Sequence, residues 1–216
     1  MLFDFQLAVD SLPFVLEGLW LTLIIALASF TLSVIFGLLF ALMKMSSFRL
    51  LNGIAHIYIS FFRGVPALVV LFYIYFGLPI IGYDISALSS AIVGLSLTST
   101  AFSAEIIRSA IISIDRGQWE AAQSLGLNYL QTLKWIIIPQ TFRVVLPPLS
   151  NVLLDLIKGT SLAAMITVPE VFQKAKIVGG AQFDYLTMYA LVAVIYWVIC
   201  TGFGIMQDKL EKSIKY

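Results

Sequence analysis

The chain has 216 residues, of which 60% are hydrophobic and only 12% are charged, and its formal net charge is +1 at pH 7. Soluble domains carry about 25% charged residues, so this composition excludes a soluble globular fold and indicates an integral membrane protein. The single cysteine, Cys200, has no partner for an intrachain disulfide, which excludes a fold held together by such bonds.

The N-terminal segment, residues 1–17, holds no Lys or Arg before the first apolar stretch. It therefore lacks the basic region of a secretory signal peptide, and we expect it to remain in the mature protein. Phe3 and Phe5 alternate with Asp4 and Asp10, a pattern that favours a short segment lying in the outer membrane interface. A solvated tail is the alternative.

Five stretches have the roughly 20 mainly apolar residues that a helix needs to cross the hydrocarbon. We therefore predict an all-α membrane protein with one transmembrane domain, residues 1–216. The predicted spans run approximately over Gly18–Met43, Ile57–Ile81, Ala87–Ile112, Val144–Ile166 and Tyr185–Met206.

Two of these spans contain residues that disturb a helix. In the second, Arg63, Gly64 and Pro66 predict a helix start at the cytoplasmic headgroups rather than a site. In the fourth, Pro147, Pro148 and Gly159 predict an interrupted helix whose free backbone groups face a pathway.

The distribution of basic residues predicts the orientation, because cytoplasmic loops of membrane proteins are enriched in Lys and Arg. With the N-terminus outside and the C-terminus inside, three basic residues lie on the outer side, namely Lys158, Lys174 and Lys176. The other ten lie on the cytoplasmic side: Lys44, Arg49, Arg63, Arg108, Arg116, Lys134, Arg143, Lys209, Lys212 and Lys215.

The longest segment between predicted spans, residues 115–143, is therefore cytoplasmic. Its composition predicts two short amphipathic helices, the first ending at Gly126 and the second, Tyr129–Ile138, stopped by Pro139. Such a pair of helices offers a surface that another protein can bind.

The sequence contains no motif that would power transport or catalysis. It has no GxxxxGK[ST] phosphate loop, and its single histidine, His56, has no Cys or second His with which to hold a metal. We predict no catalytic residue, no metal site and no cofactor bound by this chain. A transport reaction would need energy from other subunits.

Five ordered blocks stand out along the chain: GLWLTL at 18–23, FFRGVPALVVLFYIYFGLP at 61–79, AEIIRSAIISIDRGQWEAAQSLG at 104–126, IPQTFRVVLPPLSN at 138–151 and KGTSL at 158–162. The third block contains the Glu120-Ala121-Ala122 triplet and Gly126. These blocks resemble the permeases of bacterial ABC importers for polar amino acids, and the triplet with Gly126 is similar to their EAA motif.

The resemblance implies a five-helix permease in the bacterial cytoplasmic membrane that pairs with a second copy or a paralogue. Glu120, Ala121, Ala122 and Gly126 would contact an ATPase subunit, and two such subunits would bind ATP and Mg. A solute-binding protein outside the membrane would supply a polar amino acid; the remaining partner is membrane lipid, and no nucleic acid is expected. The run VPEVFQKAKI at 168–177 is most similar to cystine permeases, and Arg, Lys, His and Gln are the alternative substrates.

Polar residues within the predicted spans are candidates for the substrate pathway, because ionisable groups in a bilayer usually face a bundle interior or a wet cavity. Asp155 and Lys158 share a helix face and either form a structural ion pair or line the path. Thr160, Ser161 and, in the third span, Thr98 add hydroxyls.

Two other classes of protein fit the composition. A channel or secondary transporter that works alone would have no need of an EAA loop, and a membrane enzyme would need a catalytic constellation, which the sequence lacks.

Overall fold

The computed structural model describes residues 3–214, in which every regular element is a helix. Residues 1–2 of the expected interfacial segment and Lys215 lie outside this range. The elements are α1 (Phe5–Leu16), α2 (Leu19–Met45), α3 (Arg49–Gly64), α4 (Ala67–Phe72), the π-helical turn η1 (Tyr73–Gly77), α5 (Leu78–Ile80), α6 (Ala87–Ile112), α7 (Arg116–Ser124), α8 (Tyr129–Thr132), the π-helical turn η2 (Leu133–Ile137), α9 (Ile138–Gly159), the 3-10 helix η3 (Thr160–Ile166), α10 (Val171–Gln182) and α11 (Tyr185–Ile214).

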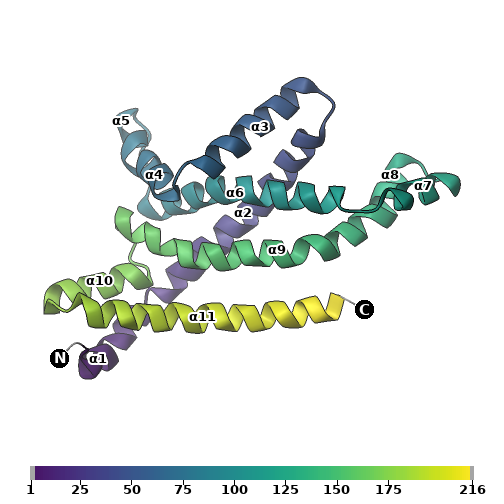
Figure 1. Cartoon of the computed structure of the whole chain (residues 1–216). Helices are drawn as coiled ribbons and strands as arrows, with labels where there is room; N and C mark the ends of the chain where they lie inside the picture. Colours follow the sequence, from purple (N-terminus) through teal and green to yellow (C-terminus); the bar gives the residue numbers. More distant parts are fainter. Residues whose placement is uncertain (1–2, 215–216) are drawn as a thin grey trace.

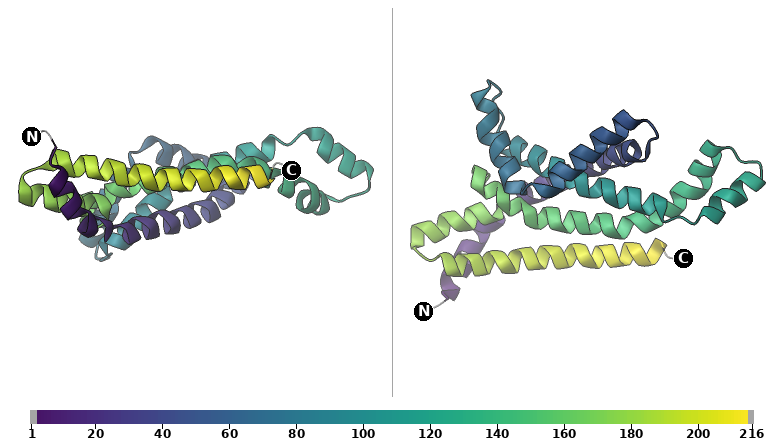
Figure 2. Two further views of the ribbon diagram at one scale, coloured as in Figure 1. Left: turned by 90° about the horizontal axis from the view of Figure 1, so that it is seen from below. Right: turned by 45° about the horizontal axis from the view of Figure 1, so that its top comes forward.

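Within these residues, four helical segments are long and apolar enough to cross a membrane, and one bent helix pair passes the same test when its two helices are taken together. The long helices α6, α9 and α11 run side by side, while α2 crosses them obliquely (Figure 1). At one end of the bundle lies α10, and at the other α7 and α8 extend beyond the long helices (Figure 2).

Small residues allow α2 and α6 to pack closely. Ser29, Ser33, Gly37 and Ala41 are spaced four apart, so they form one stripe along α2, and all four are buried. A Cβ atom built on Gly37 would lie 2.7 Å from Cβ of Ser103, so only glycine fits there. In lipid, where apolar side chains gain little by leaving the solvent, such close backbone approach is a main source of helix association.

The second predicted span is two helices rather than one. α3 and α4 meet at an angle of 103° around Val65 and Pro66, so Pro66 bends the span in its middle instead of marking its start. Pro66 cannot donate a backbone hydrogen bond and disfavours a helical conformation in the preceding residue. Val65 accordingly has extended backbone angles (φ −98°, ψ 132°).

The predicted end of a helix at Pro139 is wrong. Pro139 does not stop a helix, because the π-helical turn η2 precedes it and α9 continues through it. The same arrangement occurs at η1 and Pro79. A π turn shifts the backbone hydrogen-bond register and so accommodates a residue without an N–H group.

The prolines in the middle of α9 also leave the helix continuous. Pro147 and Pro148 both lie inside α9, which ends only at Gly159. The fourth span is therefore a single long helical segment, Tyr129–Ile166, and the prediction of a helix interrupted at these prolines is wrong.

The predicted loop between the last two spans contains α10, which is anchored by a buried carboxylate. Glu170 is fully buried and caps α10 by accepting backbone hydrogen bonds from Phe172 (2.9 Å) and Gln173 (2.8 Å). The Tyr196 hydroxyl of α11 donates to the same carboxylate at 2.9 Å. Burial raises the pKa of Glu170, although these hydrogen bonds oppose the shift. We call Glu170 and Tyr196, with the Thr160 hydroxyl 3.2 Å from Tyr196 Oη, the Glu170 cluster.

Candidate functional site

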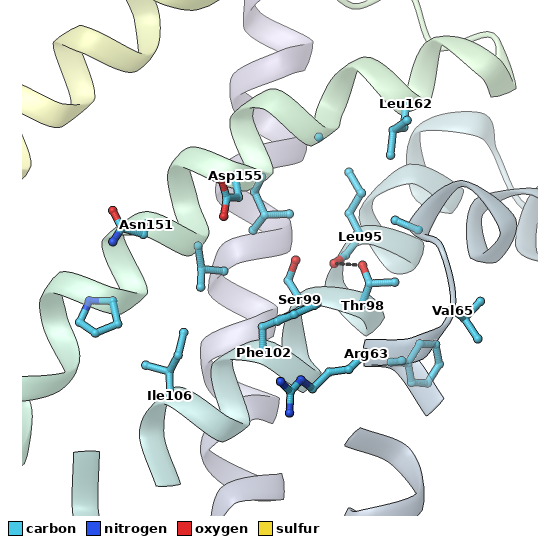
Figure 3. A pocket seen from close by; sticks show the side chains of 16 residues that line it. Arg63, Val65, Leu95, Thr98, Ser99, Phe102, Ile106, Asn151, Asp155 and Leu162 are labelled. Carbon is cyan, nitrogen blue, oxygen red and sulfur yellow. Dashed lines mark hydrogen bonds between the residues drawn. The ribbon is translucent and has the colours of Figure 1, made fainter. Parts of the chain in front are cut away.

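A cavity of about 460 Å³ lies between the end of α3, the middle of α6 and the second half of α9. Figure 3 shows side chains from these three helices converging on it. Most of its wall is apolar, including Leu95, Phe102 and Leu156. Its polar lining residues are Arg63, Thr98, Ser99, Asn151 and Asp155.

Two of the residues predicted for a pathway lie in this cavity, on opposite helices. Thr98 of α6 is buried, and its hydroxyl donates to the backbone oxygen atoms of Gly94 (3.2 Å) and Leu95 (3.1 Å). Asp155 of α9 is largely exposed to the cavity side, and its Oδ1 atom lies 2.8 Å from Nζ of Lys158. This is the ion pair that the spacing of three residues predicts.

The other three predicted pathway residues do not line the cavity. Lys158 reaches only Asp155. Thr160 is fully buried in the Glu170 cluster, where its hydroxyl donates to the backbone oxygen of Ile157 at 2.7 Å. The hydroxyl of Ser161 donates to the backbone oxygen of Lys158 at 2.8 Å.

Three polar lining residues, Arg63, Ser99 and Asn151, were not among the sequence candidates. Two carried a local signal: Asn151 is four residues before Asp155 on the same helix face, and Ser99 follows Thr98. Arg63 was expected at the headgroups. It lies in the cavity because the 103° bend after α3 turns the end of that helix against α6.

A second cavity, of about 480 Å³, adjoins the first on the side of α7 and α8. Arg63, Ile106 and Pro148 line both cavities, whereas Glu105 lines only the second. Glu105 pairs with Arg108 at 3.0 Å, as its spacing predicts, and also with Lys44 of α2. These ion pairs connect α2 to α6 beside the second cavity.

The segment with the EAA-like motif forms a helical hairpin, α7 and α8, outside the bundle (Figure 1). Asp115 caps α7 through the backbone N–H of Gly117. Gly126 has φ +78°, and the N–H of Leu127 donates to the carbonyl of Ala122 at 3.1 Å, a Schellman end that favours glycine. The prediction that Gly126 ends this helix is confirmed.

The hairpin exposes apolar side chains to solvent. Glu120 and Ala121 are exposed, whereas Ala122 is fully buried within the hairpin. Around them lie large apolar residues with exposed fractions between 59% and 79%. We call these residues the hairpin patch: Leu125, Tyr129, Leu130 and Trp135.

Within residues 3–214, no group of three or more His, Cys, Asp or Glu side chains is placed to hold a metal ion. Neither cavity is lined by His or Cys. The chemistry that the first cavity offers is binding, through one basic, one acidic and three neutral polar side chains.

Comparison with known proteins gives a family for this arrangement. Residues 33–216 match the family model described as "Binding-protein-dependent transport system inner membrane component". The chain is 55% identical over 212 residues to the probable amino-acid ABC transporter permease protein YckA of Bacillus subtilis, covering 98% of this chain and 94% of that one. It is also 39% identical to the L-cystine transport system permease protein TcyB of the same organism, covering 94% of this chain and 87% of the relative.

A solved structure has the same fold. The crystal structure of an amino acid ABC transporter with histidines contains a chain that superimposes with a TM-score of 0.92 at 35% identity. The match covers 97% of this chain and 98% of the other.

Proposed function

This chain belongs to the binding-protein-dependent transport system inner membrane components, as a permease of the polar amino acid ABC importers, and we propose that its first cavity is the path of the amino acid. Family membership makes the chain a transport subunit rather than an enzyme, working with ATPase and solute-binding partners. ATP binding lies in those ATPase subunits.

The observation that carries the proposal is the set of polar groups inside a cavity between membrane-spanning helices. An amino acid crosses as a zwitterion, and leaving its charges unpaired in an apolar medium would cost several kcal/mol or more. Thr98 and Asp155 supply a hydroxyl and a carboxylate from opposite walls. The apolar remainder of the wall gives the shape of a small-molecule site.

We propose cystine as the first candidate substrate. The run VPEVFQKAKI is similar to cystine permeases, and one relative at 39% identity is an L-cystine permease. Arginine, lysine, histidine and glutamine are the alternatives to test beside it.

The α7–α8 hairpin is proposed as the contact with the ATPase. Its hairpin patch is the kind of exposed apolar surface that marks an interaction site in a soluble region. Glu120 and Ala121 stand exposed on α7, where a small side chain lets a partner backbone approach closely. ATP and Mg would bind in two such ATPase subunits.

The proposed assembly is a pair of permease chains, with a homodimer favoured over a pair of paralogues. The N-terminus would lie outside and the C-terminus inside, with α1 in the outer interface. The Lys and Arg distribution supports this orientation, and so does the position of the N-terminus and of the hairpin at opposite ends of the bundle (Figure 1).

The test of coupling is ATP hydrolysis by the complex in proteoliposomes, together with uptake of labelled amino acids. Glu120→Lys should abolish the stimulation of hydrolysis by loaded binding protein and should stop uptake. Asp208→Lys, an equal charge reversal on the exposed end of α11, is the matched control and should leave both intact. A Glu120→Lys complex that is stimulated like the wild type would contradict the proposed contact.

The test of the pathway uses Asp155 and Lys158 singly and together. If they serve only as a structural pair, either single change strands a charge, and Asp155→Leu with Lys158→Met should restore assembly and uptake together. If Asp155 contacts the substrate, the double variant should assemble but transport poorly. Full uptake by the double variant would therefore reject the pathway role of Asp155.

A further inference from the structure

Arg63 lies where the two cavities adjoin. It lies at the end of α3, two residues before the bend at Val65, and it lines both cavities. Only Ile106 and Pro148 share this position. A solute that moved from the first cavity to the second would therefore pass beside Arg63.

Within residues 3–214, no ion pair neutralises the charge of Arg63. Among residues 3–214, the basic side chains that form ion pairs are Lys44, Arg108, Lys158 and Lys174, and Arg63 is not one of them. Its guanidinium carbon instead lies 5.8 Å from the centre of the Phe102 ring. A cation over an aromatic face is positioned and partly desolvated, yet its hydrogen-bond donors stay available.

Arg63 and an acidic residue line the same cavity from different helices. Figure 3 shows Arg63 on the α3 side and Asp155 on the opposite α9 wall. Arg63 and Asp155 are the only basic and acidic residues that line this cavity. The cavity thus offers one positive and one negative group, separated by apolar and hydroxyl-bearing side chains.

This arrangement is complementary to an amino acid with no net charge. A planar guanidinium binds a carboxylate through two parallel hydrogen bonds, which gives both strength and orientation. A cationic side chain would need a second lining carboxylate, and within the described residues Asp155 is the only one. An acidic side chain would need a second lining cation, and the cavity has none within the described residues.

We propose that Arg63 binds the α-carboxylate of the transported amino acid while Asp155 faces its ammonium group, so that the cavity selects amino acids without net charge. The proposal rests on the proposed function of this cavity and adds a substrate class and a residue that determines it. Cystine and glutamine fall within the class, whereas arginine and lysine do not.

The experiment measures amino-acid binding to the permease–ATPase complex in lipid nanodiscs without the solute-binding protein, so that any selectivity belongs to the membrane subunits. The probes are labelled L-cystine and L-glutamine, with unlabelled L-arginine and the decarboxylated analogues cystamine and 4-aminobutanamide as competitors. The variants are Arg63→Gln and Arg63→Lys. The matched control is Arg49→Gln, the same change at the other, exposed end of α3, outside both cavities.

The wild-type complex should bind a neutral amino acid at least tenfold more tightly than its amine analogue or L-arginine. Losing a charge-assisted hydrogen-bond partner costs on the order of 10- to 100-fold in affinity. Arg63→Gln should lower the affinity for the amino acid by this factor and leave the affinity for the amine unchanged. The variant should therefore show no preference between the two. Arg49→Gln should bind like the wild type.

Each contrary result has a distinct meaning. An Arg63→Gln complex that still prefers the amino acid over its amine overturns the role of Arg63, and a wild type that prefers L-arginine overturns the charge selection; both leave the proposed transport function standing. A wild-type complex that binds none of the amino acids overturns the cavity as a substrate site. If Arg63→Gln fails to assemble, Arg63→Lys provides the test, because lysine keeps the charge but cannot form the two parallel hydrogen bonds. An Arg63→Lys complex that binds the amino acid as tightly as the wild type would overturn the proposal.

Discussion

The two ends of the molecule differ in where they place polar and apolar side chains. At the α10 end, Glu170 is a fully buried carboxylate whose oxygen atoms accept three hydrogen bonds from the chain itself. At the α7–α8 end, Leu125 and Leu130 are apolar residues with exposed fractions of 79% and 72%. One end buries a polar group and satisfies it, and the other exposes apolar groups and leaves them uncovered.

The difference separates stability from interaction. A buried polar group that is fully hydrogen-bonded ties several segments into one arrangement, and removing it leaves buried donors without partners. Exposed apolar side chains contribute little to the fold and become useful only when a partner covers them. Changes at Glu170 should therefore affect the fold, whereas changes in the hairpin should affect function with little effect on the fold.

The largest effect on stability is expected at Glu170. Replacing Glu170 by Ala leaves the backbone N–H groups of Phe172 and Gln173 and the Tyr196 hydroxyl without their acceptor, a loss of about 3 kcal/mol or more. Thermal unfolding in detergent, with the yield of folded protein, measures it. Tyr196→Phe removes one donor only and should cost about 1 kcal/mol. Equal stability of Glu170→Ala and wild type would contradict the role of Glu170 in stabilising the α10 end of the molecule.

A smaller effect on stability is expected at Gly18, which holds α10 against α2. A Cβ atom at Gly18 would lie 2.5 Å from the backbone of Glu170 and Val171, so Gly18→Ala should push α10 away and cost about 1–3 kcal/mol. Gly202 of α11 has no atom within 4 Å of a built Cβ, so Gly202→Ala is the matched control and should be neutral or slightly stabilising. Equal unfolding temperatures for the two variants would contradict the contribution of the close contact at Gly18 to stability.

At the other end, Gly126→Val should change function rather than the stability of the bundle. Valine is strained at φ +78°, so the end of α7 and the hairpin patch should shift. We expect at least a several-fold loss of ATPase stimulation with an unfolding temperature close to that of the wild type. Gly126→Asn, which tolerates this conformation, should keep most of the stimulation. A large fall in unfolding temperature with Gly126→Val would show that the hairpin supports the fold after all.

The smallest expected effect is a pH dependence. Burial raises the pKa of Glu170 above its value in the unfolded chain, so the folded state holds this proton more tightly. The stability that comes from this tighter proton binding is therefore complete below the unfolded pKa, about 4.3, and is lost as the pH rises through the folded pKa. Unfolding temperatures from pH 4.5 to 7, compared with those of Glu170→Gln, should show a decline that is weaker in the variant. Parallel curves would contradict the raised pKa.

Much of the fold follows from local patterns in the sequence. The hydrophobic runs predict the spans, because about 20 apolar residues are what a bilayer requires of a helix. The turn at Gly126 and the ion pairs Glu105–Arg108 and Asp155–Lys158 were also predictable, since each depends on residues within five positions of one another.

The tertiary structure decided the features that depend on distant segments. Arg63 was expected at the headgroups, yet a bend of 103° brings it into a cavity with Asp155, which lies 92 positions later in the chain. Glu170 lies between two predicted spans, and its hydrogen bond from the Tyr196 hydroxyl depends on the packing of α11, which lies farther along the chain. Proline likewise predicts a helix end locally, but the turn at η2 carries the helix through Pro139. Local sequence determines which segments can be helical, whereas the position of a charge in a cavity or a core depends on packing between helices, which no local pattern encodes.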